Sequence, residues 1–143
     1  MKVTHLVISD LFGAGRAAVR INDAVRKCGC ESEVVILNKE LDTGSTKINL
    51  SSGEKIQRML YKRMNWLAHR GYPMNGYFHY DKYAVSMKNR DFLRDADVVH
   101  VHWINEGIYS SHFLSDLGKP VVWTLHDMWP FTGGCHYSEG CRK

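Results

Sequence analysis

Two short apolar runs in the last third of the chain each break into side chains that could do chemistry. The first run, 97–102, ends in imidazole, indole and amide groups, and the second, 120–125, ends in an imidazole and a carboxylate. Val-rich runs of this kind are typical of central strands in a parallel sheet, whose ligands bind beyond the carboxyl ends of the strands. The sequence therefore predicts a binding rim that consists of His102, Trp103, Asn105, His126 and Asp127.

A glycine-bearing loop follows the first expected strand. Gly13, Gly15 and Ala18 have G-x-G-x-x-A spacing before a helix, where backbone N–H groups can face a phosphate or a carboxylate. A purely structural turn is the alternative. A nicotinamide cofactor is disfavoured, because residues 9–12 separate the strand from the first glycine and Asn38 stands where a ribose-binding acid is expected.

His100 and His102 form an H-x-H pair that, together with His126 and Asp127, could ligate a metal as in some zinc hydrolases. Residues two apart on a strand share a face, so the pair could reach one ion only at the end of the strand. We instead expect His100 to pack beneath a helix, and we predict no metal here. A metal-dependent hydrolase that uses the His102 and His126 rim is kept as an alternative.

Four cysteines are present, and without a secretory signal we interpret them as reduced thiols. Cys135 and Cys141, with His136 between them, could form half of a thiolate metal knuckle. The other half would lie beyond Lys143, so this alternative stays open.

Composition places the chain among ordinary globular domains. It has 143 residues, 44% of them hydrophobic and 24% charged, which suits one domain with a real core. A net charge of +4 fits phosphate-bearing ligands or an anionic membrane surface and is too weak to indicate nucleic acid. No apolar run is long enough for a membrane span or a signal peptide, so we predict a cytoplasmic protein.

Hydrophobic periodicity alternates between strand and helix along the chain. We expect 41–52 to be a loop and 71–81 to be irregular. The expected strands are 2–8, 33–37, 97–102 and 120–125, and the expected helices are 16–28, 53–70, 85–94 and 109–117. This alternation predicts an α/β fold with a doubly wound parallel sheet. Because 131–143 ends as a loop, where such a fold would continue into a helix, we expect the chain to be a piece of a longer protein.

The helix expected at 54–70 is amphipathic. Our main interpretation is that its apolar stripe faces the core and its basic residues face solvent; the alternative is peripheral contact with anionic lipid. The stripe is Ile56, Met59, Leu60, Met64 and Leu67, and the basic residues are Lys55, Arg58, Lys62, Arg63 and Arg70.

Three segments together resemble a known family. They read FGAGRAAVRIN, VVHVHWIN and KPVVWTLHDMWPFTGGCHYSEGC. This pattern closely resembles the N-terminal region of family 4 glycosyltransferases of the kind found in bacterial exopolysaccharide and capsule pathways. The resemblance is strong in 13–22 and 96–141, whereas 41–85 carries none of it.

The resemblance implies a GT-B fold, in which two Rossmann-like domains face each other across a cleft. Such enzymes are hexosyltransferases that move a sugar from a nucleotide diphosphate sugar to a glycan or lipid-linked acceptor, with retention and without a metal or other cofactor. Residues 1–143 would be the acceptor-side N-terminal domain. The nucleotide-sugar-binding C-terminal domain is missing from this sequence, so we expect the chain alone to be inactive.

The family's motif positions fall on named residues here. By resemblance, Gly13, Gly15 and Arg16 approach the donor phosphates or the acceptor, and Phe12 stands where the family often has another glycine. His126 is implied to lie near the transferred sugar and is our catalytic candidate. The substrate-binding candidates on the acceptor side are His102, Trp103 and Asn105, with Asp127 beside His126.

Two further expectations concern partners. The second alternative to a transferase is a non-catalytic sugar-binding module, since half of a GT-B enzyme can only bind. An uncovered sheet edge could pair in a homodimer. A membrane-contacting helix at 54–70 would place the protein at the inner face of the membrane.

Overall fold

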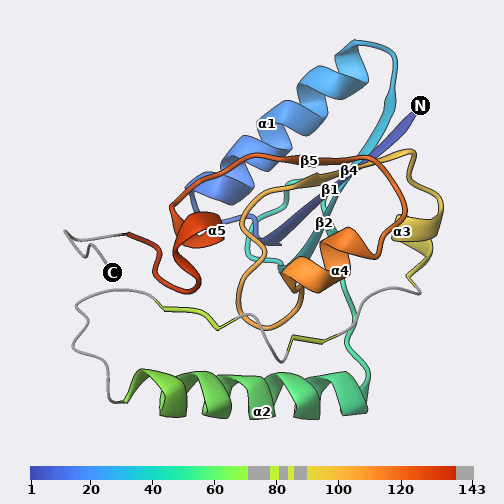
Figure 1. Cartoon of the computed structure of the whole chain (residues 1–143). Helices are drawn as coiled ribbons and strands as arrows, with labels where there is room; N and C mark the ends of the chain where they lie inside the picture. Colours follow the sequence, from blue (N-terminus) through green and yellow to red (C-terminus); the bar gives the residue numbers. More distant parts are fainter. Residues whose placement is uncertain (71–77, 81–83, 86–89, 138–143) are drawn as a thin grey trace.

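A five-stranded, all-parallel sheet forms the middle of the molecule (Figure 1). The computed structural model describes residues 1–70, 78–80, 84, 85 and 90–137. The strand order is β3-β2-β1-β4-β5. The strands are β1 (Lys2–Ser9), β2 (Glu31–Asn38), β3 (Thr46–Lys47), β4 (Val98–Val101) and β5 (Val121–Trp123). The predicted α/β class and Rossmann-like parallel sheet are confirmed.

Helices cover both faces of this sheet. They are α1 (Gly13–Lys27), α2 (Ser52–His69), α3 (Asp91–Arg94), α4 (Ser111–Ser115) and α5 (Trp129–Thr132). On one face, Ala18 of α1 packs with Val7, Val34 and Ile36. The opposite face holds the larger core, where β1, β2 and β4 meet α3 and α4; it includes Leu6, Val35, Leu93, Val99, Val101 and Phe113. Successive residues of a strand point to opposite faces of the sheet, so the strands contribute apolar side chains to the core on each face.

Helix α2 begins at a capping box and packs through polar side chains. The Ser51 hydroxyl accepts a hydrogen bond from the Glu54 backbone N–H, and the Glu54 carboxylate accepts one from the Ser51 backbone N–H. Glu54 also pairs with Arg90, and Arg58 pairs with Glu106 at 2.6 Å. Tyr61, the buried residue on this face, lies against Gly107. The inward face of α2 is therefore mostly ionic and aromatic.

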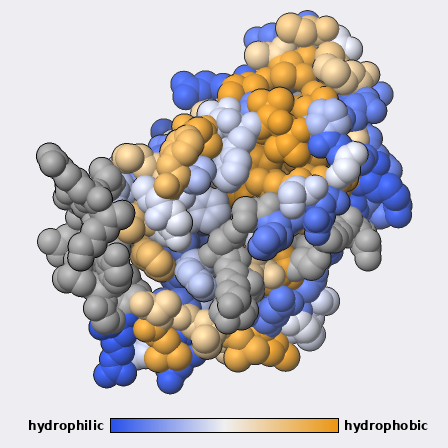
Figure 2. Space-filling view, in the orientation of Figure 1, coloured by the Kyte–Doolittle hydropathy of each residue, from blue (hydrophilic) through white to orange (hydrophobic). Residues whose placement is uncertain are grey.

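The apolar stripe of α2 points outward, so the interpretation that it faces the core is wrong. Its five side chains, from Ile56 to Leu67, are 44% to 63% exposed. Orange and blue atoms accordingly alternate along the lower edge of Figure 2, where α2 lies. None of the helices in the described part of the chain has the length and apolar character that crossing a bilayer requires.

The structure departs from the predicted elements in several places. Helix α1 begins at Gly13 and not at residue 16, so both glycines lie in its first turn and not in the loop before it. Within the loop expected at 41–52, β3 forms because Ile48 bonds back to Ile36 of β2. The helix expected at 85–94 is described only as the short α3, and Val85 is not helical. Helix α5 begins ahead of the expected terminal loop, with Pro130 in its first turn. Most of the irregular segment expected at 71–81 lies outside the described residues.

Candidate functional site

A cavity of about 530 Å³ opens at the carboxyl ends of β1, β4 and β5. Its wall combines the loop that leads into α1 with the segments that follow β4 and β5. The lining residues are Val7, Ser9, Phe12, Ala14, Gly15, Trp103, Glu106, His126, Asp127 and Tyr137. An apolar pocket with a few converging polar groups, placed beyond the ends of parallel strands, is where ligands of such sheets bind.

Gly15 lies where α1 crosses closely over the end of β1. A Cβ on this residue would come within 2.0 Å of the Ser9 carbonyl oxygen, whereas a Cβ on Gly13 would meet nothing within 4 Å. Gly15 is therefore needed for close helix-strand packing, independently of any ligand. Gly13 and Arg16 are both exposed, and neither lines the cavity.

Asp127 organises the wall of the cavity after β5. Its Oδ2 accepts hydrogen bonds from Trp103 Nε1 at 2.8 Å and from His136 Nδ1 at 2.5 Å, and its Oδ1 accepts from the Trp129 backbone at 3.0 Å. These bonds tie the segment after β4 to the segment after β5. Because a carboxylate only accepts, the proton of a neutral His136 must lie on Nδ1.

This assignment leaves His136 Nε2 as an acceptor. It lies 3.1 Å from Asn105 Nδ2 and 2.7 Å from His79 Nδ1, both of which can donate to it. Burial lowers the pKa of His79 to about 4, with a further contribution from His136. Asn105 is thus buried behind the cavity wall, where it supports His136.

His126 lies on the cavity wall, and His102 lies directly behind it. His102 Nδ1 and His126 Nε2 are 3.1 Å apart, and His102 is 2% exposed. Burial lowers the pKa of His102 to about 3, and neighbouring imidazoles add to the shift. Burial also lowers the pKa of His126, although the Asp127 carboxylate opposes this. Both rings are therefore neutral near pH 7 and can hydrogen-bond through either nitrogen.

His5, His100 and His102 form a group of three potential metal ligands, with ligand atoms within 4.8 Å of one another. His100 and His102 share a face as strand alternation requires. The rings are tilted against one another, with centroid distances of 4.8 Å and 4.3 Å from His100 and interplanar angles of 43° and 31°. His5 Nδ1 lies 3.4 Å from His102 Nε2, and His100 Nε2 lies 2.8 Å from the Thr124 hydroxyl, so these nitrogens have hydrogen-bond partners within the protein.

His100 is half-buried, and its Nε2 lies 2.8 Å from the Thr124 hydroxyl, just beyond β5. Its ring lies beside His5 and His102. That a helix packs over His100 stays a prediction. Among the other metal candidates, Cys141 lies outside the described residues, so the structure does not test the alternative of a thiolate knuckle.

The structure brings part of the predicted rim together around the cavity. Gly15, Trp103, His126 and Asp127 line it, whereas His102 and Asn105 are buried behind the wall. Sequence reasoning missed His5, His79 and His136, which complete the hydrogen bonding of this region. His5 lies within a strand, and only the register that pairs it with His100 shows its place.

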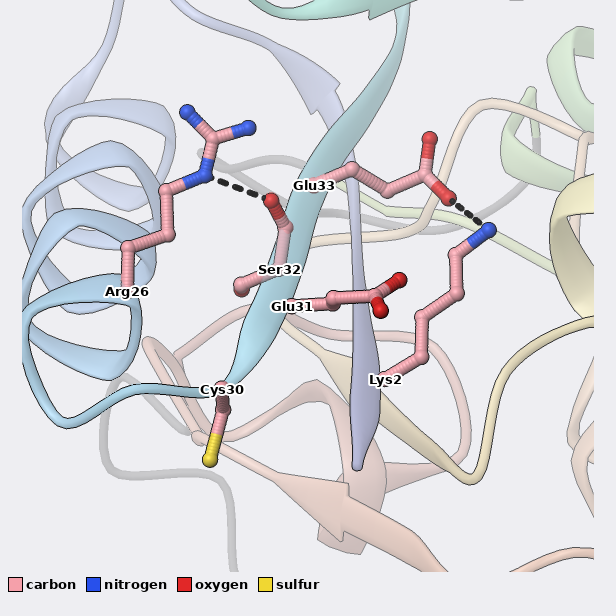
Figure 3. A pocket seen from close by; sticks show the side chains of 6 residues that line it. All are labelled: Lys2, Arg26, Cys30, Glu31, Ser32 and Glu33. Carbon is pink, nitrogen blue, oxygen red and sulfur yellow. Dashed lines mark hydrogen bonds and ion pairs between the residues drawn. The ribbon is translucent and has the colours of Figure 1, made fainter.

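A second hollow, of about 400 Å³, lies at the opposite end of the sheet (Figure 3). Lys2 pairs with Glu33 there at 3.2 Å, and Arg26 Nε donates to the Ser32 carbonyl. Lys2 is thus paired with a carboxylate and Arg26 is held by a backbone carbonyl, at the amino ends of β1 and β2. We therefore assign the candidate site to the cavity at the carboxyl ends.

Comparisons of the chain with protein-family models, with curated proteins and with solved structures found no match in any of the three.

Proposed function

We propose that this chain is the acceptor-side domain of a retaining glycosyltransferase with a GT-B fold. The observation that carries the proposal is the cavity beyond the parallel strands, which unites the first turn of α1 with His126, Asp127 and Trp103. The sequence motifs of this wall are the ones that resemble the glycosyltransferase family. A second domain would bind the nucleotide diphosphate sugar across the cleft.

The chemistry of the wall suits a sugar. The indole of Trp103 and the aromatic side chains of Phe12 and Tyr137 offer apolar surface, and sugars present both C–H faces and hydroxyl groups. The neutral His126 ring can hydrogen-bond a hydroxyl of the transferred sugar and stabilise charge that develops as the glycosidic bond breaks. Backbone N–H groups at the start of α1 would face phosphate oxygens.

Binding to the isolated chain tests this proposal. In a ¹⁵N-labelled sample, water-soluble oligosaccharides without a lipid group should shift the indole signal of Trp103 saturably. Trp66, on the exposed face of α2, should not respond and is the internal control. Nucleotide diphosphate sugars alone should bind weakly, because their main pocket would lie on the second domain. Tight, saturable binding of a nucleotide sugar, or no response of Trp103 to any acceptor, would contradict the proposal.

We also infer that α2 contacts an anionic membrane surface. Its outward stripe of Ile56, Met59, Leu60, Met64 and Leu67 is accompanied by Trp66. The guanidinium groups of Arg63 and Arg70 lie 5.3 Å and 5.2 Å from the centre of the Trp66 ring. An apolar stripe with flanking cations is what interfacial helices present to lipid headgroups. Such contact would keep a lipid-linked acceptor close to the cavity.

A further inference from the structure

A row of buried imidazoles runs from the cavity into the sheet. His126 Nε2 lies 3.1 Å from His102 Nδ1, and His102 Nε2 lies 3.4 Å from His5 Nδ1. The row ends at Ser32, whose hydroxyl is 3.1 Å from His5 Nε2. His5, His102 and Ser32 are all buried on the α1 side of the sheet. The row thus connects the cavity with the amino-terminal end of β2.

Hydrogen-bond chemistry constrains this row strongly. A neutral imidazole has one N–H donor and one bare acceptor nitrogen, so each ring that donates at one end must accept at the other. Every contact in the row joins an ε nitrogen on one side to a δ nitrogen or a hydroxyl on the other. If the Ser32 hydroxyl donates, His5, His102 and His126 all carry their proton on Nδ1. If it accepts, all three carry it on Nε2.

We propose that His102 and His5 are positioning residues that fix the orientation and the tautomer of His126. His126 Nε2 faces His102, so His126 Nδ1 is the nitrogen that can contact a ligand. That this ligand is a sugar rests on the proposed function. The state of the row decides whether that nitrogen donates to a sugar hydroxyl or accepts from one. Without the hydrogen bond to His102, His126 would be a mixture of its two tautomers.

His100 supplies a matched comparison. Its ring lies beside His5 and His102, but its Nε2 bonds to Thr124 and takes no part in the row. A change that acts through hydrogen bonds must therefore distinguish His102 from His100. A change that acts only through packing would treat both alike.

Imidazole ¹⁵N chemical shifts, which report the tautomer of each ring, test the proposal at pH 7.5 in this chain without any assay of transfer. In the wild type, His5, His102 and His126 should share one tautomer. His102→Leu should leave His126 in a mixture of tautomers. His102→Gln, whose amide supplies both a donor and an acceptor, should restore a single tautomer, and His100→Gln should not disturb it.

Different tautomers among the three rings in the wild type would overturn the proposal. An unchanged His126 tautomer in His102→Leu would do the same, as would stoichiometric zinc bound through His5 and His102. Should His102→Leu fail to fold, Ser32→Ala removes the far end of the row with little change in volume and should alter the tautomer balance at His126. A shared tautomer together with no response of the Trp103 indole signal to any acceptor would refute only the proposed function.

Discussion

His126 is the side chain whose substitution tests the proposed chemistry most directly. In a transferase that contains this domain, His126→Ala should lower turnover by about 10²- to 10³-fold, the range for losing one preorganised donor. Turnover and thermal midpoint should be measured together, with His112→Ala on the exposed face of α4 as the control. Near-normal turnover would mean that His126 is structural.

Asp127 belongs to the scaffold of the site, because its oxygens already accept from Trp103, His136 and the Trp129 backbone. An asparagine at this position keeps the shape of the side chain, but its NH₂ group replaces one accepting oxygen. This NH₂ group would then face an N–H donor, and one hydrogen bond would be lost. Asp127→Asn should therefore lower the free energy of unfolding by about 1–3 kcal/mol, measured by urea denaturation.

Asp42→Asn is the matched control for this loss, since Asp42 is an exposed carboxylate in the loop before β3. If both variants lower the free energy of unfolding by the same small amount, the hydrogen bonds at Asp127 contribute nothing specific to stability. A change in the Trp103 indole signal confined to Asp127→Asn would agree with the geometry.

At the scale of single elements, Gly15 decides how closely α1 can approach β1. Gly15→Ala places a methyl group against backbone atoms of Ser9 and Asp10, so the helix must shift. We expect a loss of about 1–3 kcal/mol, the usual cost of overpacking. Gly13→Ala, two residues earlier and in open space, should leave the thermal midpoint almost unchanged. Equal effects would show that the glycines serve backbone freedom and not packing.

Helix α2 was predictable in extent but not in orientation. Its apolar period is a local feature of the sequence, and the helix predicted from it is present over Ser52–His69. Which face turns inward depends on partners distant in sequence, namely Arg90, Glu106 and Gly107. Periodicity shows that a helix has two faces; it does not show what covers either of them.

The outward stripe of α2 leads to a prediction about lipid. The chain should sediment with vesicles rich in phosphatidylglycerol at low salt, less at high salt, and little with phosphatidylcholine vesicles. Arg63→Gln combined with Arg70→Gln should weaken binding roughly 30-fold, from about 1 kcal/mol for each cation.

Arg16→Gln combined with Arg20→Gln gives the same change in net charge on α1, where Arg16 and Arg20 are also exposed. This control should weaken binding much less. Equal weakening by both pairs would assign the attraction to net charge, and binding that is insensitive to salt would remove α2 from the proposal.

Across the whole molecule, the strand-helix alternation was enough to predict the class of the fold, because apolar runs and their spacing are local. The candidate site was predicted only where it follows strand ends, at His126, Asp127 and Trp103. His5 and His136 could not be found in this way. The first depends on the register between β1 and β4, and the second on a loop that folds back onto Asp127.

Burial of neutral histidines makes the whole domain sensitive to acid. The folded-state pKa is about 4 for His5 and His79 and about 3 for His102, against 6.5 for an unperturbed ring. Below pH 6.5 the unfolded chain therefore binds protons that the folded chain does not. The free energy of unfolding should fall as the pH drops from 6.5 toward 4, by about 1.4 kcal/mol per pH unit for each proton taken up.

Asp10 titrates at a lower pH than the range in which the buried histidines destabilise the fold. The effects of the histidines and of Asp10 on stability can therefore be measured separately. Burial raises the pKa of this carboxyl group, but hydrogen bonds from Glu40, Thr43 and Leu41 outweigh it, so the pKa lies below 3.8. Its stabilising contribution is present above that value and is lost only at lower pH. His5→Gln should thus flatten the pH dependence of stability between 6.5 and 4, by about one proton, whereas Asp10→Asn should change the slope only below about pH 4. Urea denaturation at half-unit intervals of pH measures both slopes, and a wild-type stability that is constant from pH 7 to 4 would show that the buried rings titrate normally.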